Sequence, residues 1–233
     1  MKIFYVRKFL KKILRYFLYL LEKPIKKEGI PKSKSDLIAL ERYLGGTHRG
    51  VPVREISPLD FRQSIELKKG MIGGDKMFFH QYADIYLSIF RYIKEPKNIA
   101  EIGILKGAGL GLLSFIFPQA KLYGFDIDPS HFLACKKSLK AKGAFKINDP
   151  EIRDFDQLNP ALDSKDLPLF DLIIDDGLHS QESIDNTLDC FIHLLSPGGI
   201  YVVEDLPSGY INSPLVEGYR YLCFEEMLVI FND

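Results

Sequence analysis

The sequence lacks tryptophan and holds only three cysteines among its 233 residues. Cys135, Cys190 and Cys223 are odd in number and form no Cys-x-x-Cys pair. An odd number of scattered cysteines is typical of reduced thiols that pack as small core residues. We therefore expect a cytoplasmic protein without structural disulfides.

Long hydrophobic runs are also absent. The longest uninterrupted apolar stretch, residues 16–21, is far shorter than the ~20 residues needed to span a bilayer. Charged residues interrupt any hydrophobic region of a signal peptide, and no small-residue cleavage site follows. The sequence thus predicts neither a membrane-spanning helix nor a cleaved signal.

The formal net charge is zero, but the charges are unevenly distributed. Residues 1–27 hold nine Lys or Arg and one acid, whereas the rest of the chain holds 22 basic and 30 acidic residues. Apolar residues at helical spacing over residues 2–22 predict a basic amphipathic helix. Such a helix suits either peripheral contact with the inner face of a membrane or docking on protein, including a homo-oligomer partner. The acidic remainder argues against nucleic-acid binding.

Residues 28–95 read as a helical and irregular lead-in that covers the main domain. Three prolines and the Gly45–Gly46 pair interrupt its first half. Apolar periodicity predicts helices over residues 35–43 and 78–93.

Residues 96–233 alternate short apolar runs with helical segments, which is typical of βαβ units and a parallel sheet. A hairpin over residues 219–223 and 227–231 is expected to close the sheet. We therefore predict a Rossmann-like, doubly wound α/β domain with seven strands and an antiparallel last strand. The expected strands are 97–103, 120–126, 144–147, 170–175 and 198–204, and the expected helices are 107–117, 129–142 and 181–195.

A glycine-rich loop follows the first of these strands. Neither Gly103 nor Gly107 begins a complete Gly-x-Gly-x-x-Gly fingerprint, which disfavours NAD and FAD. The remaining pattern is acid-x-Gly-x-x-x-Gly, beginning at Glu101, and it suits a ligand with a charged amino-acid end. Asp126 closes the second strand, where an acid can bind a ribose diol.

Acidic residues also end the fourth and fifth expected strands. Asp176 and the pair Glu204 and Asp205 should converge if these strands are neighbours, and such carboxylates favour Mg²⁺ or a similar divalent cation. Adjacent strand residues point to opposite faces, so Glu204 and Asp205 can share an ion only where the strand has begun to turn. His179 lies three residues beyond Asp176, and histidine is the residue type best suited to accept a proton near neutrality.

Residues 97–205 resemble the class I S-adenosylmethionine-dependent methyltransferases. The matching motifs are Glu101-Ile-Gly103, Gly124-Phe-Asp126, residues 170–176 and Pro197-Gly-Gly199. The resemblance implies that the first motif and Gly107 surround the methionine moiety, that Asp126 holds the ribose and that Asp149, after the third strand, lies near adenine. The residues assigned to the cofactor are Glu101, Gly103, Gly107, Asp126, Asp149 and Asp175.

Asp-Gly-x-His at 176–179 and Glu-Asp at 204–205 also resemble the metal-dependent sugar O-methyltransferases of macrolide tailoring. The resemblance implies Asp176, Glu204 and Asp205 as metal ligands and His179 as general base. It implies a small-molecule or glycan acceptor with a reactive hydroxyl. Leu178 stands where that family usually has serine, which puts the polarity of the acceptor side in question.

Three alternatives stay open at the level of sequence. A related Mg²⁺-dependent methyltransferase would act on another small-molecule diol. A hydroxylase-like protein would use His179 and Asp176 in an iron site, although a second nearby histidine is lacking. A non-catalytic protein would bind the cofactor and use its basic helix for assembly.

Overall fold

The computed structural model describes residues 28–44, 76–77, 80–224 and 226–233. The predicted basic helix within residues 1–27 lies outside these residues, and so do residues 45–75. The chain divides into two compact units, Met1–Arg91 and Tyr92–Asp233. The division into residues 1–27, 28–95 and 96–233 stays a prediction.

The described part of the first unit holds two helices, α2 (Lys34–Leu44) and α4 (Ala83–Tyr92), whose last residue begins the second unit. The side chain of Ser33 accepts a hydrogen bond from the Asp36 amide, which caps the start of α2. Lys34 pairs with Asp84 at 2.8 Å and ties the two helices together. The helix expected over residues 35–43 is confirmed, whereas that expected from residue 78 begins at Ala83.

The second unit is built on a sheet of seven strands in the order β3-β2-β1-β4-β5-β7-β6. Only β7 runs antiparallel to the other strands, as expected for this architecture. The sheet prediction is confirmed. The strands are β1 (Asn98–Ile102), β2 (Lys121–Asp126), β3 (Glu151–Asp154), β4 (Phe170–Asp175), β5 (Leu195–Val203), β6 (Arg220–Phe224) and β7 (Met227–Phe231).

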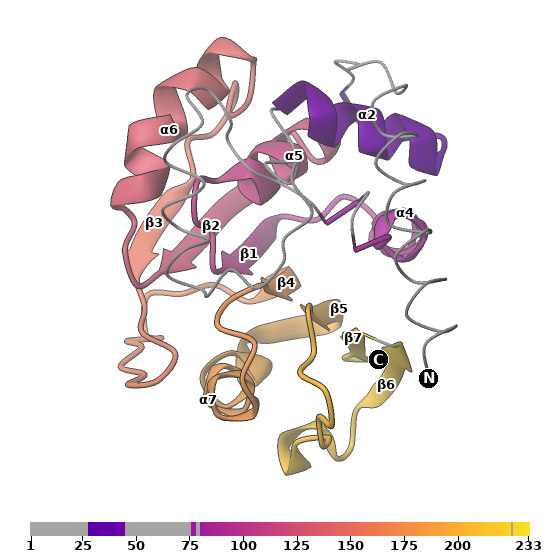
Figure 1. Cartoon of the computed structure of the whole chain (residues 1–233), viewed down its shortest axis with the longest axis vertical. Coiled ribbons are helices and arrows are strands. Elements are labelled where there is room, and N and C mark those ends of the chain that lie inside the picture. Colours follow the sequence, from indigo (N-terminus) through magenta and orange to yellow (C-terminus); the bar gives the residue numbers. More distant parts are fainter. Residues whose placement is uncertain (1–27, 45–75, 78–79, 225) are drawn as a thin grey trace, which may run out of the picture. The chain divides into compact units, whose positions relative to one another are not determined.

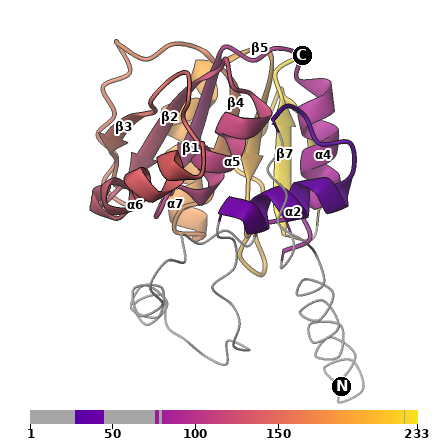
Figure 2. The same ribbon diagram turned by 90° about the horizontal axis from the view of Figure 1, so that it is seen from above.

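Helices cover both faces of this sheet. Helices α5 (Ala108–Ile116) and α6 (Ser130–Ala141) lie on one face, and α7 (Gln181–Phe191) lies on the other (Figure 1). Figure 2 shows α5 and α6 from a second direction, in front of β1 and β2. The apolar core on the α7 side includes Phe125, Phe155 and Phe191, whose rings meet edge to face.

The strand register brings the ends of the parallel strands to one edge. Ile102 pairs with both Phe125 and Asp175, and Asp175 pairs in turn with Val203. The residues that follow β1, β2, β4 and β5 therefore emerge together. Ligands of open α/β sheets bind at this carboxyl edge.

The strand expected at residues 144–147 is wrong, because β3 lies at Glu151–Asp154. Phe145 has φ +55°, which is incompatible with a strand, and its ring packs against Phe132 of α6 at 6.0 Å. The apolar residues in this stretch thus belong to a loop. β3 is a short edge strand with no fully buried side chain, so it carries no apolar run.

The boundary between α7 and β5 also differs from expectation. The helix ends at Phe191 and continues as a 3₁₀ turn to Leu194, and β5 begins at Leu195. Pro197 therefore lies within the strand, where the pairing with β4 is irregular. Among the described residues, no helix is long and apolar enough to cross a bilayer.

Candidate functional site

The loop after β1 packs closely against the loop after β4. Gly103 has φ +81°, and a Cβ at this position would lie 2.2 Å from the backbone oxygen of Asp176. Its amide donates to the Phe125 carbonyl at 2.8 Å. Gly103 therefore makes the predicted turn and keeps the ends of β1, β2 and β4 together.

Gly107 precedes α5 and also adopts the left-handed conformation, with φ +79°. A Cβ here would lie 2.4 Å from the ring of Phe132 on α6. Its bare backbone thus serves the packing of α6 against the loop. Its predicted role beside a cofactor stays a prediction.

Glu101 is buried near the end of β1, with only 2% of its surface exposed. A Cβ on Gly109 would lie 1.9 Å from Glu101 Oε1, so the carboxylate occupies the space that this glycine leaves in α5. Sequence reasoning assigned no role to Gly109. The available signal was a glycine inside a predicted helix, eight positions after an acid, where glycine otherwise lowers helix stability.

The Asp126 carboxylate fixes the loop that leads into α5. The Leu105 amide donates to Oδ2 at 2.8 Å, and the Asp128 amide donates to Oδ1 at 2.9 Å. Each carboxylate oxygen can accept a further hydrogen bond. Asp126 could therefore also accept hydrogen bonds from a ribose diol, and this predicted role stays a prediction.

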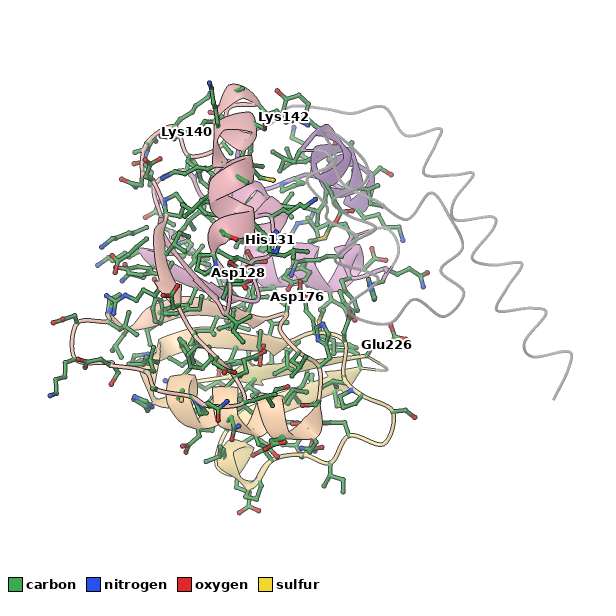
Figure 3. The ribbon with its side chains drawn as sticks, turned by 60° about the vertical axis from the view of Figure 1, so that its left-hand side comes forward. Asp128, His131, Lys140, Lys142, Asp176 and Glu226 are labelled. Carbon is green, nitrogen blue, oxygen red and sulfur yellow. The ribbon has the colours of Figure 1, made fainter. Side chains whose placement is uncertain are left out.

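The placement of Asp149 after the third strand is wrong. Asp149 precedes β3 and forms ion pairs with Lys136 at 3.3 Å and Lys140 at 2.7 Å. Lys140 and His131 lie at opposite ends of α6 (Figure 3), with His131 in its first turn. The hydrogen bond from Lys140 lowers the pKa of Asp149. The error follows from the misplaced third strand, and Asp149 lies near the opposite edge of the sheet.

The residues that follow β3 hold the loop after β4 in place. The Gln157 side-chain amide donates to Asp175 Oδ1 at 2.9 Å and to Thr187 Oγ1 at 2.6 Å. Its oxygen accepts from the Leu178 amide at 2.7 Å. Asp175 is 2% exposed, and its carboxylate accepts hydrogen bonds from the Gln157 side chain and from the Gly177 amide. The assignment of Asp175 to the cofactor stays a prediction.

Asp176, His179 and Asp205 converge at the carboxyl edge of β4 and β5. His179 Nε2 lies 3.7 Å from Asp176 Oδ1 and 4.0 Å from Asp205 Oδ2. One ligand atom from each residue lies within 4.8 Å of the other two, a spacing that can hold a metal ion. Asp176 follows directly after β4 (Figure 3). The structure thus brings together the base and two of the predicted metal ligands.

The Glu204 carboxylate is not part of this group of ligand atoms in the described structure. Its side chain is 1% exposed, and its amide donates to the Asp175 carbonyl at 2.9 Å, which continues the β4–β5 pairing. The predicted role of Glu204 as a metal ligand stays a prediction. Asp205 has φ +51°, so the chain turns only at that residue.

His179 lies directly before the N-cap of α7. Ser180 is the N-cap of α7, with its side chain accepting from the Ser183 amide and the Ser183 side chain accepting from the Ser180 amide. His179 itself has φ +58°, a sparsely populated conformation for a residue with a side chain. Such strain persists where the surrounding contacts impose it and is common at functional sites.

The comparisons with known proteins place the chain beside sugar O-methyltransferases. It is 27% identical over 143 residues to mycinamicin VI 2''-O-methyltransferase of Micromonospora griseorubida, covering 57% of this chain and 33% of that protein. It is 30% identical over 165 residues to L-olivosyl-oleandolide 3-O-methyltransferase of Streptomyces antibioticus, covering 67% and 39%. No protein-family model matches. The chain spans about a third of the length of these relatives.

Solved structures support the fold. The MycE methyltransferase of the mycinamycin pathway, in complex with Mg and SAH, matches with a TM-score of 0.50 and 20% identity, covering 67% of this chain and 51% of that one. TrmN from Thermus thermophilus matches with a TM-score of 0.50 and 15% identity, covering 62% and 47%. The second unit has the fold of the class I methyltransferases. Its resemblance to the macrolide-sugar O-methyltransferases, inferred from motifs, is confirmed by the relatives.

Proposed function

We propose that this chain transfers a methyl group from S-adenosylmethionine to a hydroxyl group of a sugar or glycan-type acceptor, with the help of a divalent cation. The convergence of Asp176, His179 and Asp205 at the carboxyl edge carries this proposal. The sequence similarity to sugar O-methyltransferases supports the choice of acceptor. The acceptor identity and the hydroxyl position are part of the test.

Two of the three converging side chains are carboxylates, which suit a hard divalent cation. Asp176 and Asp205 supply two carboxylates, the ligand type that Mg²⁺ prefers. Glu204 lies outside this group of ligand atoms, so we propose Asp176 and Asp205 as the principal ligands and Glu204 as a further one. A bound cation would lower the pKa of a nearby hydroxyl and orient it.

In this mechanism His179 accepts the proton of the acceptor hydroxyl. The hydroxyl oxygen forms a bond to the methyl carbon while the carbon–sulfur bond breaks, and the electron pair of that bond stays on sulfur. Glu101 would hold the amino group of the donor's methionine moiety, and Asp126 would hold its ribose. The chain contributes alignment and proton removal, each of which accelerates such reactions substantially.

The test uses the purified full chain with isotopically labelled S-adenosylmethionine, Mg²⁺ and a panel of glycosides, sugar nucleotides and catechols. We expect label on a sugar hydroxyl, loss of transfer with EDTA and recovery with Mg²⁺. His179→Ala should lower the rate by about 100-fold or more, as for loss of a general base. His193→Ala is the matched control, because His193 is an exposed histidine that precedes β5.

Transfer that neither EDTA nor His179→Ala reduces would contradict the metal and base assignments. Transfer to catechols alone would replace the sugar acceptor by another small-molecule diol. The hydroxylase alternative is less favoured, because the donor group in the second unit combines one imidazole with two carboxylates rather than two imidazoles with one.

A further inference from the structure

We propose that Gln157 is a positioning residue that holds the segment 176–179, and with it His179, in its reactive geometry. We call residues 176–179 the base segment, because the proposed general base lies at its end. This inference rests on the proposed function for its catalytic consequence. Its structural part rests on the hydrogen bonds of Gln157 alone.

The Gln157 side chain uses its full donor capacity. Both amide protons are donated, one to Asp175 Oδ1 at 2.9 Å and one to Thr187 Oγ1 at 2.6 Å. The amide oxygen accepts from the Leu178 amide at 2.7 Å. Because the amide nitrogen can only donate and the oxygen can only accept, these partners fix its orientation. One side chain thus connects the strand before the base segment, the segment itself and helix α7.

The surroundings of Gln157 are shaped around this arrangement. Gln157 is 9% exposed, and a Cβ on Gly177 would lie 1.9 Å from its Oε1. The backbone carbonyl of Gln157 accepts from Asn186 Nδ2 at 2.9 Å. Thr187 in turn donates to the Ser183 carbonyl at 2.6 Å within α7. The main chain and side chain of Gln157 are therefore both anchored to the helix that starts directly after the base segment.

The bond to the Leu178 amide explains why this anchoring reaches His179. Leu178 is half exposed, so its side chain contributes little packing that could hold the segment. His179 adopts φ +58°, which the chain would relax if Leu178 were released. Ser180 is fixed separately, because it is the N-cap of α7 and is hydrogen-bonded to Ser183. Gln157 therefore fixes the backbone on the N-terminal side of His179, and the helix cap fixes it on the C-terminal side.

The experiment compares Gln157→Met, an apolar replacement of similar length, with Gln119→Met as control. Gln119 is exposed in the turn before β2, at the opposite edge of the sheet. Amide hydrogen exchange of peptides covering residues 176–180 is measured together with binding of S-adenosylhomocysteine. For Gln157→Met we expect exchange at least about tenfold faster in these peptides, since a buried hydrogen bond is lost. Strand peptides from β1 and cofactor affinity should stay unchanged.

In the methyl-transfer assay, Gln157→Met should lower kcat about tenfold or more and leave KM for S-adenosylmethionine within about twofold. Thr187→Val removes one hydrogen-bond acceptor of Gln157 without touching the carboxyl edge, and it should act in the same direction. Thr187→Ser keeps the hydroxyl and should have a smaller effect than Thr187→Val. This pair keeps the test decisive if Gln157→Met fails to fold.

Unchanged exchange of residues 176–180 in Gln157→Met would overturn the proposal whatever the activity. Faster exchange with unchanged kcat would overturn the role in positioning the base. A loss of S-adenosylhomocysteine affinity with unchanged exchange would make Gln157 a cofactor contact instead. Absence of methyl transfer in the wild type would refute the proposed function, while the exchange data would still decide whether Gln157 holds the base segment.

Discussion

Replacing Gly109 by alanine should disturb the cofactor side of the site without touching the carboxylate–histidine group. The new Cβ would lie 1.9 Å from Glu101 Oε1 and 2.6 Å from its Cδ, and Glu101 is almost fully buried. The carboxylate must therefore move. Such overpacking costs about 1–3 kcal/mol, offset by the roughly 0.5–1 kcal/mol that alanine gains over glycine in a helix. We expect a net loss of stability of about 1–2 kcal/mol.

The effect on cofactor affinity should be larger than that on stability. Displacing Glu101 removes a hydrogen bond from a charged group, worth about 1.5–3 kcal/mol. Affinity for S-adenosylhomocysteine should therefore fall about 10- to 100-fold in titration calorimetry. Glu101→Gln should weaken affinity in the same direction without the steric cost. Adding Glu101→Asp to Gly109→Ala shortens the acid and should recover stability.

Binding of S-adenosylhomocysteine by Gly109→Ala within about twofold of the wild type would show that Glu101 keeps its place and that the clash is relieved elsewhere. A stable variant with lost affinity would support Glu101 as a cofactor contact. A destabilised variant with normal affinity would show that the buried acid serves only the fold.

Three further predictions concern residues away from that contact. Asp149→Asn should leave cofactor affinity unchanged. Because Lys140 lowers the pKa of Asp149 below the unfolded value of about 3.9, the wild type should melt at a higher temperature than the variant at neutral pH, and the two melting temperatures should converge in acid. A difference that grows in acid would contradict this prediction. Gln181→Leu removes two hydrogen bonds to the Ile211 backbone, both 3.0 Å, and should speed amide exchange at residue 211. Unchanged exchange would show that these two hydrogen bonds do not hold the Ile211 backbone. Tyr201→Phe should preserve or raise the melting temperature, since the buried hydroxyl has no hydrogen-bond partner among the described residues; a fall of several degrees would reveal one.

The fold was largely predictable because most of its strands are buried on both faces. Strands β2 and β4 carry apolar residues and end in an acid, and their expected limits differ from the observed ones by at most one residue. β3 was missed because an edge strand needs no apolar run. Residues 144–147 were predicted instead, because they include apolar side chains, but they form a loop in which Phe145 packs on α6. That single error also moved Asp149 to the wrong edge of the sheet.

The site was predictable where its residues are close in sequence. Asp176 and His179 belong to one short motif at a strand end, and Asp205 follows the neighbouring strand. Gln157 was missed because its contact with Leu178 spans 21 positions and depends on the true position of β3. Glu204 continues the β4–β5 pairing through its amide, and its role as a metal ligand stays a prediction.

The most direct test of the account uses S-adenosylmethionine with a deuterated methyl group, Mg²⁺ and a glycoside acceptor, followed by NMR of the product. We predict a deuterated methoxy group on one sugar carbon, formed by the wild type and not by His179→Ala. Tight binding of S-adenosylhomocysteine together with a product methylated on nitrogen, or equal product from His179→Ala, would contradict the claim that the three converging side chains activate a hydroxyl.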